Sequence, residues 1–228
     1  PKISTPTYEL EIPSTKKKIR YRPFLVKEEK ILIIAMESQS DTEIANAVKD
    51  VLSTCILTKG VKVDTLSTFD IEYLFLNIRG KSVGEDVEVL VTCPDDNKTK
   101  VPVRINLDDI KIITHNDHKR DIKLDDSLLM RMRYPSINEF IKSNFSTSEV
   151  KSEDTFDLII SCIEQIYNNE ESWSTSDCTK EEMNDFLDQL NSNQFKEIEK
   201  FFDTMPKLSH TLTVNNPNTK VKSDIKLE

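Results

Sequence analysis

Cysteine and histidine are the side chains that could ligate a metal ion in this chain, and both are sparse. The stretch from Cys93 to Asp96 stands at an expected turn where a zinc knuckle would carry Cys-Pro-x-Cys. Asp96 occupies the position of the second thiolate, whereas tetrahedral zinc needs about four Cys or His ligands. His115 and His118 have the spacing of a metal clip but fall in a polar loop. We therefore expect no bound metal, with Cys93 a small residue that faces the core.

Nucleotide binding and covalent catalysis lack the residues that they need. Residues 80–82, Gly-Lys-Ser, resemble the end of a Walker A loop, but Phe75 stands where that loop needs its first glycine. The chain has three glycines in all, too few for a dinucleotide-binding fold. It has no Gly-x-Ser-x-Gly elbow, and no pair of carboxylates in an apolar stretch that would separate their pKa values. The prediction is a protein that is not an enzyme, with no catalytic residues, no cofactor and no small-molecule substrate.

The elements expected from periodicity are helices and short strands, which indicate an α+β fold. Ser40 and Glu43 form a capping-box pattern ahead of apolar residues at helical spacing. A further helix is expected from Ser67 to Gly80, where it stops. Residues 87–107 alternate apolar and polar around a Pro-Asp-Asp-Asn-Lys turn, which predicts a β-hairpin. The remaining predictions are strands at 110–114, 120–124 and 127–134, helices at 136–141, 154–167, 179–190 and 193–205, and a second hairpin at 211–228.

The chain is expected to be elongated, since hydrophobic residues make up 37% of it, against an average of about 45–50%. Its predicted segments are an extended basic arm (1–30), an α/β-hairpin domain (31–135), an acidic helical segment (136–206) and a C-terminal β-hairpin (207–228). Five of nine positions are identical between residues 99–107 and 219–227. A true internal repeat and a common hairpin pattern both remain open as explanations.

Charge is distributed unevenly along the chain, whose net charge is −9. Residues 1–30 hold eight Lys or Arg against four Glu, and residues 146–203 hold fifteen Asp or Glu against four Lys. The proline-rich arm has too little apolar periodicity to fold by itself, so we expect it to order against a partner or against the body of the chain. Its candidate partner-binding residues are Lys16, Lys17, Lys18, Arg20, Arg22 and Phe24. A pI of about 5.0 makes nucleic acid an unfavourable main ligand.

The longest apolar run, residues 31–36, is far shorter than the roughly 20 residues that cross a bilayer. The first residues are polar, and the four cysteines are dispersed rather than arranged as a disulfide framework. These features predict a soluble intracellular protein that does not associate with membranes.

Two stretches, Tyr21–Leu32 and Phe69–Glu85, are similar to the baseplate hub subunit of T-even-like contractile-tailed bacteriophages and to the related baseplate hub assembly catalyst. The order of parts also matches: a basic arm, two helices, an Arg-Gly-Lys-Ser-x-Gly turn, a hairpin, Tyr134-Pro135, an acidic segment and a closing hairpin. Some members of this family carry Cys-Pro-x-Cys at the first hairpin, which this chain lacks.

The resemblance implies a non-enzymatic viral structural or assembly protein of the tail baseplate hub, acting through protein–protein contacts. Its partners would be other hub and baseplate proteins of the same phage, and its location the baseplate of the virion, after assembly in the host cytoplasm. The alternatives are a chaperone-like hub assembly factor absent from the mature virion, or a regulator that binds nucleic acid through the basic arm. Arg79 and Lys81, in the turn between the predicted helix and hairpin, are a second predicted contact with a partner.

Overall fold

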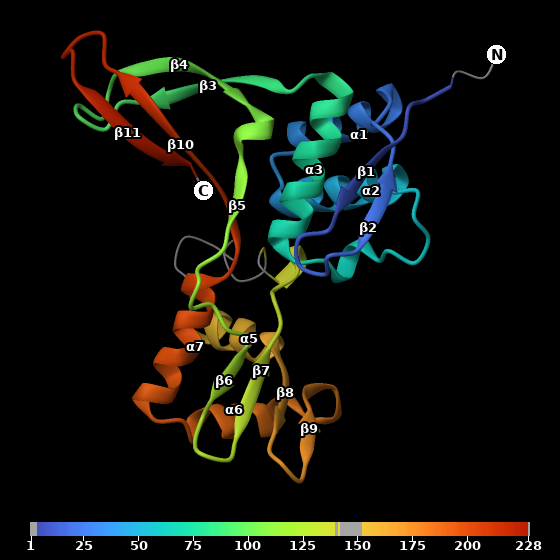
Figure 1. The fold of residues 1–228 in the computed structure, drawn as a ribbon, viewed down its shortest axis with the longest axis vertical. Coiled ribbons are helices and arrows are strands. Elements are labelled where there is room, and N and C mark those ends of the chain that lie inside the picture. The colour runs from blue at the N-terminus through green and yellow to red at the C-terminus, as the bar shows by residue number, and fades with distance from the viewer. Residues whose placement is uncertain (1–3, 140, 142–151, 228) are drawn as a thin grey trace. The chain divides into compact units, whose positions relative to one another are not determined.

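The computed structural model describes residues 4–139, 141 and 152–227, and it divides into two compact units (Figure 1). The first unit consists of Pro1–Val63, Phe69–Ile113 and Lys207–Glu228, and the second of Asp64–Thr68 and Thr114–Pro206. Helices and small antiparallel sheets occur together in the chain, which confirms the predicted α+β class.

The first unit begins with a paired hairpin where the sequence predicts an extended arm. Strands β1 (Tyr8–Glu11) and β2 (Lys18–Tyr21) are antiparallel, and Ile19 and Tyr21 are buried at alternate positions of β2. The prolines in this region lie outside the strands, and Pro13 is the first residue of the hairpin turn, where its fixed φ is favourable. The arm therefore orders against its own unit, and the side-chain hydroxyl of Ser14 in its turn donates to Asp70 Oδ2 at 2.5 Å.

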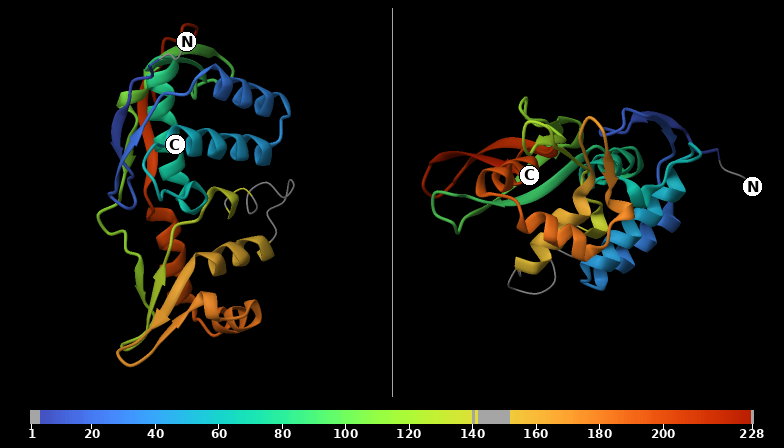
Figure 2. Two further views of the ribbon diagram at one scale, coloured as in Figure 1. Left: turned by 90° about the vertical axis from the view of Figure 1, so that its right-hand side faces the viewer. Right: turned by 90° about the horizontal axis from the view of Figure 1, so that it is seen from below.

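The three α-helices of the first unit are α1 (Val26–Glu37), α2 (Asp41–Cys55) and, from Phe69 on, α3 (Thr68–Val83). A 3₁₀ turn at Val63–Thr65 stands between α2 and α3 in the chain. Helices α1 and α2 run side by side and are joined at their free end by a short loop (Figure 2). The predicted capping box is confirmed in one of its two hydrogen bonds: the Ser40 hydroxyl accepts the backbone N–H of Glu43, whereas the Ser40 backbone N–H donates to the Ser38 hydroxyl. The predicted stop at Gly80 is wrong, because α3 continues to Val83 and Gly84 takes the positive φ of 109° that ends it.

Both predicted hairpins are present in the first unit. Strand β3 (Asp86–Thr92) pairs with β4 (Lys100–Asn106), and β10 (Lys207–Asn215) pairs with both β11 (Lys222–Leu227) and β5 (Lys111–Ile113). A 3₁₀ turn at Leu107–Asp109 separates β4 from β5. The buried residues that join the two hairpins are Val91, Cys93, Ile105, Leu212 and Val214.

The second unit contains a four-stranded antiparallel sheet in the order β6-β7-β8-β9. Its strands are β6 (Asp121–Lys123), β7 (Leu129–Met132), β8 (Ile163–Tyr167) and β9 (Ser172–Ser174). The α-helices of this unit include α5 (Ser152–Cys162), α6 (Lys180–Asp188) and α7 (Ser192–Thr204), and a 3₁₀ turn lies at Thr175–Asp177. The core that they share includes Met130, Met132, Ile163, Ile198 and Phe201.

Most of the described residues in the acidic segment are helical, as predicted, but the single helix predicted over residues 154–167 is wrong. The helix ends at Cys162, and the next five residues form β8, which pairs with β7 on one side and β9 on the other. Ile163 and Ile166 fit helical spacing, but they are β-branched and fit a central strand equally well. The predicted helices near 179–190 and 193–205 and the predicted strands at 110–114, 120–124 and 127–134 are confirmed. Of the helix predicted at 136–141, Phe140 lies outside the described residues.

Candidate partner-binding surfaces

The basic side chains of the β1–β2 hairpin are exposed, but acidic side chains face them across the strands. Lys16, Lys17, Lys18 and Arg20 are all exposed. In the antiparallel register, Arg20 lies opposite Glu9 and Lys18 lies opposite Glu11. Directly opposed residues of opposite charge attract each other. Lys16 also lies 3.9 Å from Glu11, so the exposed face of the hairpin carries both signs of charge with more cations than anions.

Arg22 and Phe24 make internal contacts that hold the start of α1. The Arg22 guanidinium donates to Glu28 Oε1 at 2.8 Å, and the backbone N–H of Leu25 donates to Glu28 Oε2 at 2.7 Å. Burial alone would raise the pKa of Glu28, but these hydrogen bonds lower it to about 2. Phe24 is buried, and its backbone N–H donates to the Ser82 hydroxyl at 2.9 Å. These two predicted contact residues therefore connect the hairpin and α1 to α3.

The predicted turn contact lies within the last turns of α3. Lys81 pairs with Glu85, and its ammonium lies 5.8 Å from the centre of the Tyr8 ring. Arg79 is half-buried, and its Nη1 is a buried atom without a hydrogen-bond partner among the residues that the structure describes. The fold thus brings Lys81 against the first strand of the arm and leaves Arg79 with an unused donor.

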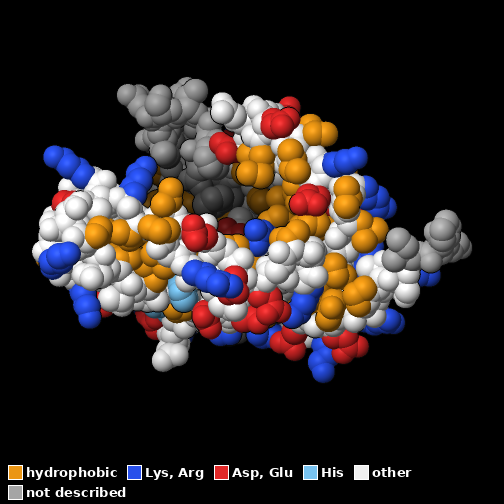
Figure 3. Space-filling view, turned by 90° about the horizontal axis from the view of Figure 1, so that it is seen from above, with side chains coloured by type: hydrophobic (Ala, Val, Ile, Leu, Met, Phe, Trp, Pro, Cys, Tyr) orange, Lys and Arg blue, Asp and Glu red, His pale blue; other side chains and the backbone are white. Residues whose placement is uncertain are grey.

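A surface that sequence reasoning missed lies on the second half of α1. Figure 3 shows hydrophobic side chains exposed to solvent among charged ones on the face that it draws. We call four exposed side chains of this helix the α1 apolar surface: Ile31, Ile33, Ile34 and Met36. The sequence signal for this surface is the apolar run at residues 31–36, from which we infer above only that it is too short to span a membrane. Of the residues in α1, only Glu28 and Ala35 are buried.

The turn that resembles a zinc knuckle is held by hydrogen bonds instead of ligands. The buried Asn216 amide donates to Asp95 Oδ2 at 3.0 Å and to Asp96 Oδ2 at 3.0 Å, which joins the tips of the two hairpins. Asp96 Oδ1 also accepts the backbone N–H of Thr99. Hydrogen bonds lower the pKa of Asp96, and those from Thr99 contribute most. Hydrogen bonds from Thr219 and Asn216 lower the pKa of Asp95. We call this network the tip clip.

The other groups that could react or bind a metal include two cysteine thiols and the imidazole of His118, and all three are packed inside the structure. Among the described residues, no group of three or more His, Cys, Asp or Glu side chains could hold a metal ion. Burial raises the pKa of Cys55 to about 11 and that of Cys162 to about 12, so both thiols are protonated near neutral pH. The His118 ring nitrogens lie 3.0 Å from the Tyr134 hydroxyl and 2.9 Å from the Thr204 hydroxyl. These thiols and this imidazole are packing groups in the structure.

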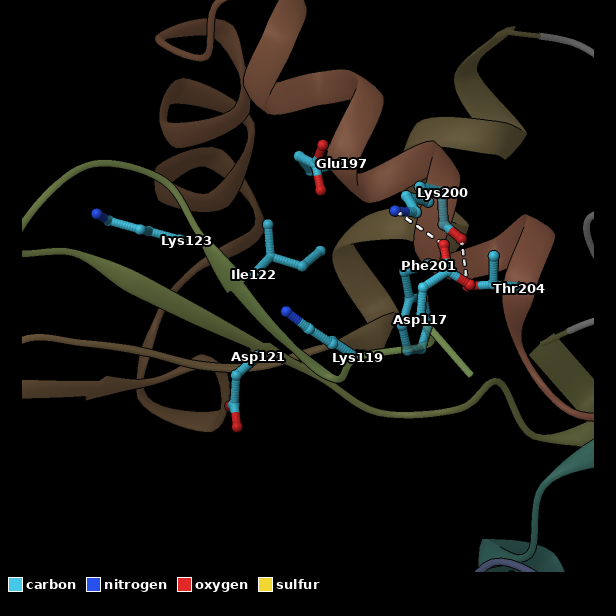
Figure 4. A pocket seen from close by; sticks show the side chains of 9 residues that line it. All are labelled: Asp117, Lys119, Asp121, Ile122, Lys123, Glu197, Lys200, Phe201 and Thr204. Carbon is cyan, nitrogen blue, oxygen red and sulfur yellow. Dashed lines mark hydrogen bonds and ion pairs between the residues drawn. The ribbon is translucent and has the colours of Figure 1, made fainter. Parts of the chain in front are cut away.

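A shallow cavity of about 420 Å³ in the second unit carries balanced charge (Figure 4). Lys200 pairs with Asp117 at 3.0 Å, and Phe201 lies at the wall. The charged side chains that line it are Asp117, Lys119, Asp121, Lys123, Glu197 and Lys200. Three positive and three negative groups give the cavity no preference for a charged ligand of either sign.

No helix in the described part of the chain has the length and apolar character of a membrane span. The family model described as T4 bacteriophage base plate protein matches residues 5–228, so the chain belongs to that family. It is a phage baseplate protein with a structural role in the tail of the virion. Searches of curated proteins and of solved structures each found no match.

Proposed function

We propose that this baseplate protein acts in the hub of the tail baseplate, as a non-enzymatic structural or assembly protein that works through protein–protein contacts. The observation that carries the proposal is the similarity of Tyr21–Leu32 and Phe69–Glu85 to the hub subunit and the hub assembly catalyst, within a chain of the baseplate family. The two stretches meet in the fold, because the Phe24 backbone N–H donates to the Ser82 hydroxyl. They therefore form one connected part of the first unit, which supports a shared role.

The proposed partners are other hub and baseplate proteins of the same phage, met in the host cytoplasm during assembly. In this proposal Lys16, Lys17, Lys18 and Arg20 contact an acidic surface of a partner. Arg22, Phe24 and Lys81 support that contact by fixing the hairpin and α1 against α3, and Arg79 on α3 is a second proposed contact with a partner. No cofactor or small-molecule substrate is involved.

Mass spectrometry of purified mature tails and of hub assembly intermediates tests the proposal. A chain present in both is a structural hub subunit, and a chain present only in the intermediates is an assembly factor. A chain absent from the hub intermediates contradicts the proposal.

The role of the hairpin is tested by replacing Lys16, Lys17, Lys18 and Arg20 with glutamine. We expect weaker co-purification with hub proteins and less dependence on salt, because attraction between exposed charges is screened by ions. The matched control replaces four exposed lysines of the other two hairpins: Lys98, Lys100, Lys220 and Lys222. Equal losses in the two variants would show that only net charge matters. Salt-sensitive binding of DNA that the first variant loses would favour the nucleic-acid alternative.

A further inference from the structure

The second half of α1 is apolar on nearly every side, which is unusual for a helix open to solvent. The exposed fractions are 44% for Ile31, 50% for Ile33 and 66% for both Ile34 and Met36. Helices that are hydrophobic all round are normally buried, and contiguous apolar patches on a protein surface mark interaction sites. Helix α1 packs along α2, and Ala35 is the buried residue in its second half.

Hydrogen bonds at the first turn of α1 fix the start of the helix, whereas the exposed apolar side chains lie in its second half. Glu28 is 2% exposed and receives hydrogen bonds from Arg22 and from the backbone of Leu25. These contacts fix where the helix begins. They do not require isoleucines at positions 33 and 34, because neither side chain is buried against the unit.

The charges around the end of α1 are of one sign. Residues 31–48 contain no Lys or Arg, whereas Glu37, Asp41 and Glu43 are all exposed. The last turn of α1 also has no basic residue, so Glu37 adds its charge to the negative end of the helix dipole. The α1 apolar surface is therefore bordered by acidic side chains at the free end of the α1–α2 pair, whereas the exposed Lys27 and Lys30 border its other end.

We propose that the α1 apolar surface is the docking site for an amphipathic helix of another protein, one whose apolar stripe is flanked by Lys or Arg. Such a helix would cover Ile33, Ile34 and Met36 and place its cations beside the acidic rim. A second copy of this chain is the competing occupant, and sedimentation of the chain distinguishes it from a basic amphipathic helix. The inference rests on the proposed function only in taking the partner to be another hub protein.

The direct test uses two synthetic amphipathic helical peptides with the same leucine stripe, one flanked by lysines and the other by glutamates. Binding of each labelled peptide to the full chain is measured by fluorescence anisotropy at low and at high salt. We expect the lysine peptide to bind at least about tenfold more tightly at low salt, and the difference to shrink as salt rises. Equal affinity for the two peptides overturns the proposal.

Substitutions test whether the lysine peptide binds at the α1 apolar surface. We expect Ile34→Asp and Met36→Asp to abolish binding of the lysine peptide, and the exposed positions should leave the circular dichroism of the chain unchanged. Leu90→Asp is the matched control, since Leu90 is 71% exposed on β3, away from the helix pair in sequence and element. If Ile34→Asp disturbs folding, Ile34→Ser takes its place. Binding that survives Ile34→Asp, or that Leu90→Asp loses equally, contradicts the proposal.

A variant with fewer acidic side chains tests the preference for the lysine peptide. Glu37→Lys combined with Asp41→Asn should remove the preference for the lysine peptide while keeping the apolar surface. Sedimentation of the wild-type chain tests the second copy as occupant: a dimer that Ile34→Asp dissociates would overturn the proposal. A negative peptide test together with detection of the chain in hub intermediates would refute this docking site and leave the proposed function standing.

Discussion

Helix α1 of the first unit and helix α7 of the second are nearly equal in length, 12 and 13 residues, but they use their apolar residues in opposite ways. Helix α7 buries Ile198 and Phe201 in the core of its own unit. Helix α1 buries Glu28 and Ala35 and leaves Ile34 and Met36 in solvent. One helix is stabilised by apolar packing, whereas the other is held at its start by a buried ion pair.

The comparison distinguishes the apolar side chains that stabilise the fold from those that remain available to bind a partner. Apolar side chains that are buried already contribute to folding, whereas those that remain exposed can contribute free energy when a partner covers them. Substitutions in α7 should therefore change the free energy of unfolding, and substitutions on the outer side of α1 should change binding alone.

The largest effect is expected in α7. Phe201→Ala should lower the free energy of unfolding of the second unit by about 3–5 kcal/mol, because it leaves a cavity in the core. It also removes the ring contacts to Tyr134 and His118. Urea unfolding followed by the fluorescence of Trp173, the single tryptophan of the chain, reports on this unit. Phe156→Ala is the control, because Phe156 is more exposed, and an equal loss there would contradict the comparison.

The next effect is expected at the start of α1. Glu28→Gln should destabilise the first unit by about 3 kcal/mol, because it leaves the Arg22 guanidinium without its charged acceptor. Hydrogen exchange of the amides in α1 measures the loss. Glu29→Gln, the neighbouring position, should exchange at nearly the wild-type rate, and similar acceleration in both variants would show that the ion pair is not what holds the helix.

The same residue should make the first unit sensitive to acid. The pKa of Glu28 is lowered to about 2 in the folded chain, below its ordinary value of 4.5. Its contribution to stability is therefore present above about pH 4.5 and is lost as the pH falls towards 2. We expect the wild-type chain to lose more stability than Glu28→Gln when unfolding is compared at pH 6 and pH 3. Parallel losses in the two chains would place the acid sensitivity elsewhere.

A smaller effect is expected at the tip clip. Asn216→Ala should cost about 1–3 kcal/mol, because it removes the hydrogen bonds that the buried Asn216 amide donates to two charged carboxylates. Asn218→Ala is the matched control, since Asn218 is exposed and its side-chain amide donates to the Thr99 hydroxyl. Thermal unfolding of both variants, with hydrogen exchange in β4 and β11, would detect the difference. Zinc added to either variant tests whether the two carboxylates gain affinity for a metal once the amide is gone.

The smallest effect is expected on the outer side of α1. Ile34→Ser should change the free energy of unfolding by no more than about 0.5 kcal/mol, because the side chain is mostly in solvent already. Chemical denaturation monitored by circular dichroism checks this. A loss comparable to that of Phe201→Ala would mean that α1 is packed like α7 and would remove the contrast between them.

The sequence predicted elements best where a local rule dominates. The cap at Ser40, the hairpin at 87–107 and the helix opened by Thr179 and Glu182 all follow from side chains close in sequence, and the structure confirms them. The prediction failed at Ile163–Tyr167, where helical spacing and β-branched residues favour different structures. Pairing with β7 and β9 decided the outcome there.

The basic arm shows that the candidate site, like the fold, could be predicted from the sequence only in part. Its composition predicted exposed cations, and Lys16 to Lys18 are exposed. The burial of Phe24, and the pairing of Arg22 with a glutamate six residues later, depend on how the hairpin lies against α1 and α3. Charge counting along a chain cannot distinguish a cation in solvent from one committed to a buried partner.

By itself, the sequence determined the α+β class, the positions of the capped helices and of both hairpins in the first unit, and the resemblance to phage baseplate proteins. These follow from alternation, helical spacing and capping, which act over a few residues. Only the tertiary structure decided that Glu28 is buried and that Ile33, Ile34 and Met36 are exposed. The reason is physical: burial depends on which elements pack against a helix, and in the described part of the chain the apolar run of α1 has α2 along one side and solvent on the other.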